Sequence, residues 1–300
     1  MAIASTPNDV SQLKAQDEAL ASRGLWRDTF YRFTRHRLGM LGAFLVSVLV
    51  ILAIFGPTLA PYDPNQMVFT SAFADPSGTN LLGADDFGRD ILSRIMYGAR
   101  VSLLVGVISV SLASTVGTTL GMIAGYGNRW VDEIIMRVMD VLFAFPAILL
   151  ALAVMAILGK GVGNAMIAIG IVYIPIFARI ARSSVLKVKN EEFVHAAEAL
   201  GSNDAGILVR HIFPNILAPI IVETSLSLSF AILAEAALSF FGLGTQPPDP
   251  SWGRMLSEGR EFFRQSVWIG IFPGLAIMFS VMGFNFLGDG LRDALDPRMK

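Results

Sequence analysis

Long apolar runs alternate with short polar segments along this 300-residue chain. A helix needs roughly 20 apolar residues to cross the ~30 Å hydrocarbon core of a bilayer, because it rises ~1.5 Å per residue. Six stretches reach or approach that length, so the pattern predicts an all-α membrane protein with six transmembrane helices. The predicted spans are residues 38–59, 101–126, 141–158, 162–180, 216–240 and 265–287.

The distribution of Lys and Arg predicts how these spans are oriented. Cytoplasmic loops of membrane proteins carry an excess of both residues. If the N-terminus is cytoplasmic, 16 of the 23 Lys and Arg lie in cytoplasmic segments. We therefore expect a multi-pass protein with both termini in the cytoplasm. The cytoplasmic segments are then 1–37, 127–140, 179–213 and 288–300, and the external ones about 60–100, 159–161 and 241–264.

The chain divides into a tail, residues 1–37, and a six-span domain, residues 38–300. The first part of the tail is polar and lacks the apolar core of a signal peptide. Near its end, Trp26, Phe30 and Phe33 recur at helical spacing among four arginines. This pattern is typical of an amphipathic helix in the membrane interface, with its arginines toward lipid phosphates. An equal alternative is that it forms the basic flank of the first span.

Two external segments are long enough to fold. The first, residues 62–100, is rich in turn-forming residues and is predicted to become helical from Ile91. The second, residues 242–264, holds three prolines that forbid a regular helix until about Ser251. Both segments could contact a partner outside the membrane.

Composition narrows the classes of function. Hydrophobic residues make up 54% of the chain and charged residues 16%, which fits a membrane protein better than a soluble domain. A net charge of −1 gives no reason to expect a nucleic-acid partner. The chain has no cysteine, and its three histidines lack ligand spacing. We therefore expect no catalytic residues, no metal site and no cofactor.

One polar segment, residues 191–215, stands between the fourth and fifth predicted spans. Its sequence is EEFVHAAEALGSNDAGILVRHIFPN. The alanines favour a helix, Gly201 ends it, and the Ser202-Asn203-Asp204 run can cap a second short helix that ends before Pro214. The pattern predicts a cytoplasmic helix-turn-helix that lies on the membrane surface.

The spacing in this segment resembles the cytoplasmic loop of ABC importer permeases. In that loop, Glu-Ala-Ala is followed by Gly four residues after the second Ala, and by Pro thirteen residues later. Here the corresponding residues are His195-Ala196-Ala197, Gly201 and Pro214. The usual glutamate is replaced by His195, and any ionic contact made by that carboxylate passes to a neighbouring acid. The candidates are Glu191, Glu192 and Glu198.

The resemblance extends from about residue 30 to the C-terminus. The stretches GADDFGRDILSRIMYGARVSL, DVLFAFPAILLALA, LSFFGLGTQPPDPSWGRML and FNFLGDGLRDALDPRMK look like the C-type permease subunit of dipeptide, oligopeptide and nickel ABC importers. That family implies a bacterial inner-membrane protein that pairs with a B-type permease, two cytoplasmic ATPases and an extracytoplasmic solute-binding protein. ATP hydrolysis would belong to the partners, so the chain itself would not be an enzyme. A short peptide is the expected substrate, and nickel or another small polar solute stays open.

The resemblance also implies that segment 191–215 couples the permease to its ATPases, and we call this segment the coupling loop. Small residues would allow close approach to the ATPase, and a glycine would allow the chain to reverse. An ordinary amphipathic loop is the alternative. The residues expected to contact the ATPase are Glu191, Glu192, His195, Ala196, Ala197, Glu198, Gly201 and Ser202.

Three carboxylates in or beside apolar spans are candidates for the translocation pathway: Asp140, Glu223 and Glu235. A carboxylate in hydrocarbon costs ~2.5 to 3.5 kcal/mol on insertion scales, so these side chains should face protein or water. Glu223 and Glu235 lie ~18 Å apart along one helix and cannot form a single site. A structural hydrogen bond or ion pair is an equally good explanation. A proton relay in an ion-coupled transporter, or a membrane enzyme, would be a rival function.

Local sequence also predicts two features of packing. Pro146 deletes a backbone donor and should kink the third span. Gly117 and Gly121 lie four residues apart in the second span, which favours close contact with another helix.

Overall fold

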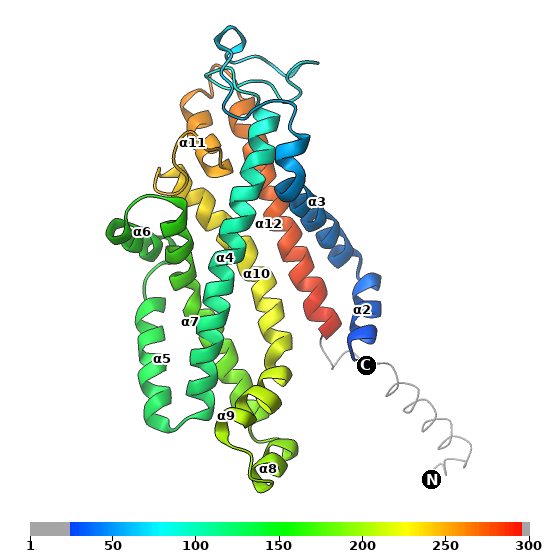
Figure 1. The fold of residues 1–300 in the computed structure, drawn as a ribbon, viewed down its shortest axis with the longest axis vertical. Helices are drawn as coiled ribbons and strands as arrows, with labels where there is room; N and C mark the ends of the chain where they lie inside the picture. The colour runs from blue at the N-terminus through cyan, green and yellow to red at the C-terminus, as the bar shows by residue number, and fades with distance from the viewer. Residues whose placement is uncertain (1–24, 296–300) are drawn as a thin grey trace, which may run out of the picture.

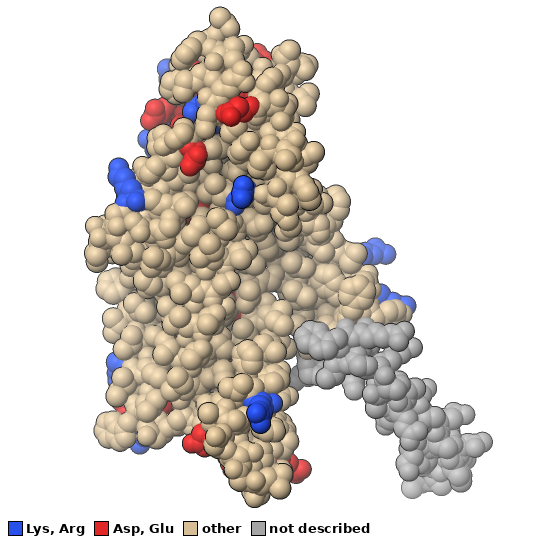
Figure 2. Space-filling view, in the orientation of Figure 1, with Lys and Arg blue, Asp and Glu red and all other residues tan. Residues whose placement is uncertain are grey.

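A computed structural model describes residues 25–295 of the chain, so most of the predicted tail and the last five residues lie outside the described residues. Figure 1 shows an elongated bundle of helices whose long axis runs from a small helical projection at one end to loops and a short helix at the other. On the face drawn in Figure 2, charged side chains gather toward the two ends, and the wide middle band is almost free of them. This distribution suits a bundle that crosses a membrane.

Helices account for most of the described chain. Their bounds are α2 Leu25–Arg35, α3 Arg37–Leu59, α4 Ile91–Tyr126, α5 Arg129–Phe143, α6 Ala147–Leu158, α7 Val162–Val188, α8 Glu192–Ala199, α9 Asp204–Gly206, α10 Phe213–Phe240, α11 Trp252–Glu261 and α12 Trp268–Leu295, with a 3₁₀ turn at Phe69–Ser71 and a π-helical segment at Ile207–Ile212. Within residues 25–295, five helical segments are long and apolar enough to cross a membrane, and a sixth span arises if the bent pair α5–α6 counts as one. The all-α, multi-span prediction is confirmed.

Three predicted spans are too short at one end. Helix α4 begins at Ile91, where the predicted span begins at 101; α7 continues to Val188 and α12 to Leu295. Hydropathy marks the part of a helix that lies in hydrocarbon, whereas the backbone continues to wind through the polar residues beyond it. The start of α4 was nonetheless expected in the external segment, and Asp90 caps it by accepting a hydrogen bond from the Ser93 amide at 2.8 Å.

The third predicted span is wrong as a single helix over 141–158. Helix α5 already begins at Arg129, and the chain turns by 94° before α6 starts at Ala147. Pro146 occupies the N-cap of α6, where its missing N–H and fixed φ end one helix and start another. The predicted kink is therefore a break between two helices.

Close packing of α4 against α7 forms the centre of the bundle. A Cβ placed on Gly117 would lie 2.5 Å from the carbonyl oxygen of Ile174, and one placed on Gly121 would collide with the carbonyl oxygen of Ala178. These two glycines let the two backbones approach each other, as their four-residue spacing predicted.

At the outer end, α11 folds back onto the head of α4. Trp252 is 2% exposed, and its indole N–H donates to the carbonyl of Ile95 at 3.0 Å. Ser251 caps α11 through its hydroxyl, so the helix begins where the prolines were predicted to allow it. The external segments are thus tied to the bundle.

At the opposite end, α2 forms the helix that the tail was predicted to contain. His36 separates it from α3; its Nδ1 accepts from the Gly39 amide at 2.9 Å, and its Nε2 lies 3.1 Å from Asp293 at the end of α12. Contact of α2 with lipid stays a prediction.

Candidate functional site

The coupling loop begins with α8, Glu192–Ala199, and turns at Gly201. The Gly201 amide donates to the Glu198 carbonyl at 2.9 Å, and the Ser202 amide to the Ala197 carbonyl at 3.1 Å. This pair of bonds is a Schellman motif, which needs a left-handed residue after the helix. Gly201 supplies it with φ of +80°. The predicted role of Gly201 as the turn residue is confirmed.

The second arm of the coupling loop differs from the prediction. Asn203 caps α9 by accepting from the Gly206 amide at 2.7 Å, as expected for a capping residue. The helix does not end before Pro214, however. It continues through the π-helical segment into α10, where Pro214 is the second residue, and the altered winding just before it accommodates a residue that lacks an N–H. The loop and the fifth predicted span therefore share one helix from Asp204 to Phe240.

Burial divides α8 into an inner and an outer face. Val194 and Ala197 are buried in the main core together with Ile207 of the second arm. The other predicted contact residues, namely Glu191, Glu192, His195, Ala196, Glu198, Gly201 and Ser202, are exposed. Figure 1 shows α8 projecting beyond the ends of the long helices. The loop is an anchored protrusion whose outer surface is open to a partner.

Sequence reasoning missed Leu200, the residue at the tip of this protrusion. It is the C-cap residue of α8, and its side chain is 87% exposed.

The structure also shows which acidic side chain lies beside His195, the position of the usual loop glutamate. His195 Nδ1 lies 3.4 Å from a carboxylate oxygen of Glu198, and both side chains are exposed. Of the three candidate acids, Glu198 therefore places its charge beside the substituted position. The loop is further tied to the bundle by Tyr126, whose hydroxyl lies 3.2 Å from the Asp204 carboxylate.

Among the pathway candidates, Asp140 is paired with a residue that sequence reasoning did not select. Arg179 of α7 donates to the Asp140 carboxylate at 2.7 Å and stacks over the Phe143 ring at 4.2 Å. Arg179 stands inside the predicted span 162–180, so an arginine within an apolar run was the available signal. Arg179 also begins the predicted cytoplasmic segment 179–213.

Glu223 and Glu235 lie in different surroundings on α10. Glu223 is half-buried and accepts from the Ser227 hydroxyl at 3.0 Å. Glu235 is fully buried, where Ser239 donates at 2.7 Å and Ser102 of α4 at 3.2 Å. Glu235 thus has the structural hydrogen bonds that were the alternative to a pathway role, and the structure does not bring the two carboxylates together.

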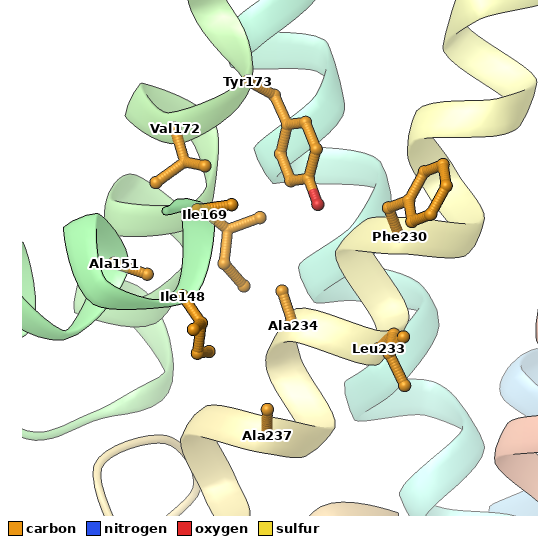
Figure 3. Close-up of a pocket in the computed structure, with 10 residues that line it drawn as sticks. Ile148, Ala151, Ile169, Val172, Tyr173, Phe230, Leu233, Ala234 and Ala237 are labelled. Atoms are coloured by element: carbon orange, nitrogen blue, oxygen red, sulfur yellow. The ribbon is translucent and has the colours of Figure 1, made fainter. Parts of the chain in front are cut away.

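An apolar pocket of about 240 Å³ opens between α6, α7 and α10. Figure 3 shows the Tyr173 side chain pointing into it, with its hydroxyl as the oxygen among the labelled apolar side chains. A second pocket of about 140 Å³ adjoins it, since both are lined by Ala147, Val172 and Tyr173. The two pockets follow the inner side of the α5–α6 break.

A charged cluster at the outer end was not predicted. Asp85, Asp86 and Glu258 offer oxygen atoms within 4.8 Å of one another, a spacing that could hold a metal ion. The nearly buried guanidinium groups of Arg89 and Arg94 supply the positive charge instead: Arg89 lies 2.6 Å from Asp85, and Arg94 lies 3.3 Å from Glu258. Burial, and next the Asp85 carboxylate, raise the pKa of Asp86 above its ordinary value. The cluster joins α11 to the head of α4.

Known proteins share both the sequence and the fold. Residues 117–300 match the family described as "Binding-protein-dependent transport system inner membrane component", and residues 24–76 match the "N-terminal TM domain of oligopeptide transport permease C". The dipeptide transport system permease protein DppC of Alkalihalophilus pseudofirmus is 49% identical over 92% of this chain and 90% of its own length. The glutathione transport system permease protein GsiD of Pectobacterium atrosepticum is 46% identical over 92% of both chains.

A solved structure supports the fold. A chain of the MetNI methionine ABC transporter, in an inward-facing conformation, superimposes with a TM-score of 0.57 at 14% identity and covers 68% of this chain and 96% of its own. At that identity the likeness concerns the fold alone. The family match covers more than half of the chain, and the two permeases are similar over nearly its full length. This chain therefore belongs to the family of binding-protein-dependent transport system inner membrane components.

Proposed function

We propose that this chain is the permease subunit of an ATP-driven importer of di- and oligopeptides. The observation that carries the proposal is the coupling loop, a protrusion anchored in the core and continuous with a membrane-spanning helix. A permease without its own ATPase needs such a part, because force generated in a soluble partner has to reach the spans. The dipeptide and glutathione permeases to which the chain is similar supply the class of substrate.

In this proposal the chain works within a complex. A B-type permease completes the translocation pathway, two ATPase subunits seat the coupling loops on the cytoplasmic side, and a solute-binding protein delivers peptide at the outer end. Both termini of this chain are cytoplasmic, on the same side as α8. Closure of the ATPases on ATP displaces the loop, and the displacement opens the pathway outward before the complex resets.

The exposed residues of the coupling loop have separate roles. Leu200 enters an apolar part of the ATPase cleft, because a leucine exposed to this extent gains free energy from burial. Glu198 makes the ionic contact that the usual loop glutamate would make, since its carboxylate lies beside His195. Val194 and Ala197 carry no contact with the ATPase; they hold α8 to the bundle.

Reconstitution tests this function. The chain is expressed with its neighbouring permease, ATPase and binding-protein subunits, and uptake of a radiolabelled dipeptide into proteoliposomes is measured with ATP and with a non-hydrolysable analogue. Uptake that requires ATP and the binding protein is the expected result. Unlabelled glutathione and a nickel complex serve as competitors and report the solute preference.

The chain reconstituted alone is the control. Uptake by the chain alone, driven by a proton gradient and without ATPases, would contradict the proposal and support an ion-coupled transporter. Leu200→Ser should reduce ATP-driven uptake while the chain stays in the membrane.

A further inference from the structure

The break between α5 and α6 leaves exposed, irregular backbone partway along a predicted span. Residues 143–147 are all exposed, and the Phe145 side chain is 55% exposed. No side chain caps the first turn of α6, whose N-cap is Pro146. The first amides of a helix have no acceptor within the helix, so those of α6 need a partner from elsewhere.

Lipid cannot supply that partner. Hydrocarbon offers no hydrogen bond, and an unsatisfied backbone group there costs several kcal/mol. Irregular backbone at membrane depth is therefore tolerated only where protein covers it or where it lines water. This side of the chain does not face lipid in the working protein.

Charged side chains lie on the same side of the break. The Arg179 guanidinium, 41% exposed, contacts both Asp140 and the Phe143 ring at the end of α5. An arginine has five N–H donors, and the bond to Asp140 uses one of them. Asp140 ends the predicted cytoplasmic segment 127–140 and Arg179 begins the segment 179–213, so this exposed ion pair, like the irregular backbone, needs water or protein beside it.

An apolar pocket lies farther along the same helix, α7. Tyr173 is six residues from Arg179, a distance of ~9 Å along α7. It points into the larger pocket. A di- or tripeptide reaches at most ~7 to 11 Å, so a peptide whose carboxylate meets Arg179 can place a side chain in the pocket beside Tyr173.

We propose that the α5–α6 break, Arg179 and Tyr173 form the wall of the aqueous pathway, where Arg179 receives the carboxylate end of a peptide. The pockets beside Tyr173 accept apolar side chains of the peptide. The assignment rests on the proposed function, and it adds Arg179 and the break to the carboxylates selected from sequence.

Cysteine labelling tests whether the break lines water. The chain has no cysteine of its own, so a single introduced thiol reports one position. In the complete transporter, Phe145→Cys should react with a charged, membrane-impermeant thiol reagent in either the resting or the ATP-bound state, and a transported dipeptide should slow that reaction. Ile54→Cys on α3, at a side chain 62% exposed in the isolated chain, is the control; its place in an apolar span leads us to expect that it faces lipid and does not react. Failure of Phe145→Cys to react in both states, or its cross-linking to the second permease, would overturn the assignment.

Uptake per ATP hydrolysed tests the arginine. Removing a hydrogen bond to a charged group costs about tenfold or more in binding, so Arg179→Gln should import at least about tenfold less peptide per ATP than wild type. Arg179→Lys should recover part of the loss. Arg182→Gln is the matched control, because Arg182 makes a similar ion pair with α5, to Asp132 at 2.6 Å, three residues away on α7.

Two outcomes would count against the arginine. If Arg179→Gln imports as much peptide per ATP as wild type, Arg179 has no role in receiving peptide. If Arg182→Gln loses as much import per ATP as Arg179→Gln, the role of Arg179 is only to hold α5 against α7. If the wild-type complex imports no peptide, the failure lies with the proposed function instead.

Discussion

Replacement of Gly201 by valine isolates the turn of the coupling loop from the rest of the fold. Gly201 has φ of +80°, and a Cβ added there would meet no atom within 4 Å. The free-energy cost of Gly201→Val therefore comes from the backbone conformation at this position and not from a clash with neighbouring atoms. A left-handed conformation costs a residue with a side chain ~1 to 2 kcal/mol, and a β-branched residue is at the upper end.

That strain acts on two hydrogen bonds. The amides of Gly201 and Ser202 both donate to carbonyls of the last turn of α8, and both bonds depend on the left-handed residue. A loss of ~1 to 2 kcal/mol lowers the population of the intact turn by a factor of about 5 to 30 relative to rearranged turns. Val194 and Ala197 keep α8 attached to the core, so the rearrangement tilts α8 and moves Leu200 at its tip.

The assay compares membrane insertion, assembly and coupling in one preparation. Gly201→Val should insert and pair with the second permease normally, because the spans lie outside the strained turn, while less ATPase co-purifies or more ATP is hydrolysed per peptide imported. Gly201→Asn is the control, since asparagine tolerates the left-handed region. Normal docking and coupling in Gly201→Val would refute the reasoning, and loss of the whole protein from the membrane would show that the turn serves folding.

Three further predictions concern the rest of the chain. Gly121→Leu should separate α4 from α7 and lower the midpoint of thermal unfolding in detergent, because its side chain would meet backbone; Gly163→Leu, with open space at its Cβ, should change it little. Because the pKa of Asp86 is raised in the folded protein, its contribution to stability is greatest below the ordinary value of 3.8 and is lost as pH rises through the raised pKa. Asp86→Asn should therefore make the thermal unfolding midpoint less dependent on pH, measured from about pH 4 upward. Cysteines at the exposed positions Ala205 and Asp249 should label from opposite sides of the membrane in intact cells, and labelling of both from outside would contradict the orientation.

Hydropathy predicted which parts of the chain cross the membrane because transfer into hydrocarbon dominates the free energy of a span. It could not predict where helices end. The transfer free energy of side chains does not determine where a helical backbone ends. Helix α7, whose predicted span ends at 180, therefore continues to Val188. The direction change at Pro146 was visible as a missing donor, but its size depends on how α6 packs against α7 and α10, which no local sequence signal reports.

The coupling loop was predictable where backbone chemistry decides it. A glycine after a run of helix formers, followed by capping residues, specifies the turn at Gly201, and the structure has it there. The continuation past Pro214 was not predictable from the proline alone, because the local π-helical winding that accommodates it has no signal in the sequence. Arg179 was visible in the sequence, yet its pairing with Asp140 joins two separate helices and requires the tertiary fold.

The uninterrupted helix from Asp204 to Phe240 has a mechanical consequence. A hinge between the coupling loop and α10 would absorb a displacement of the loop locally, whereas a continuous rod acts as a lever. Asp204 is held at Tyr126 near one end, and Glu235 is held by hydroxyl groups of α4 and α10 near the other. A sideways displacement of the coupling loop is therefore transmitted along the helix to its middle, where Glu223 lies. The position of Glu223 along the helix sets how far its side chain moves for each ångström that the loop moves.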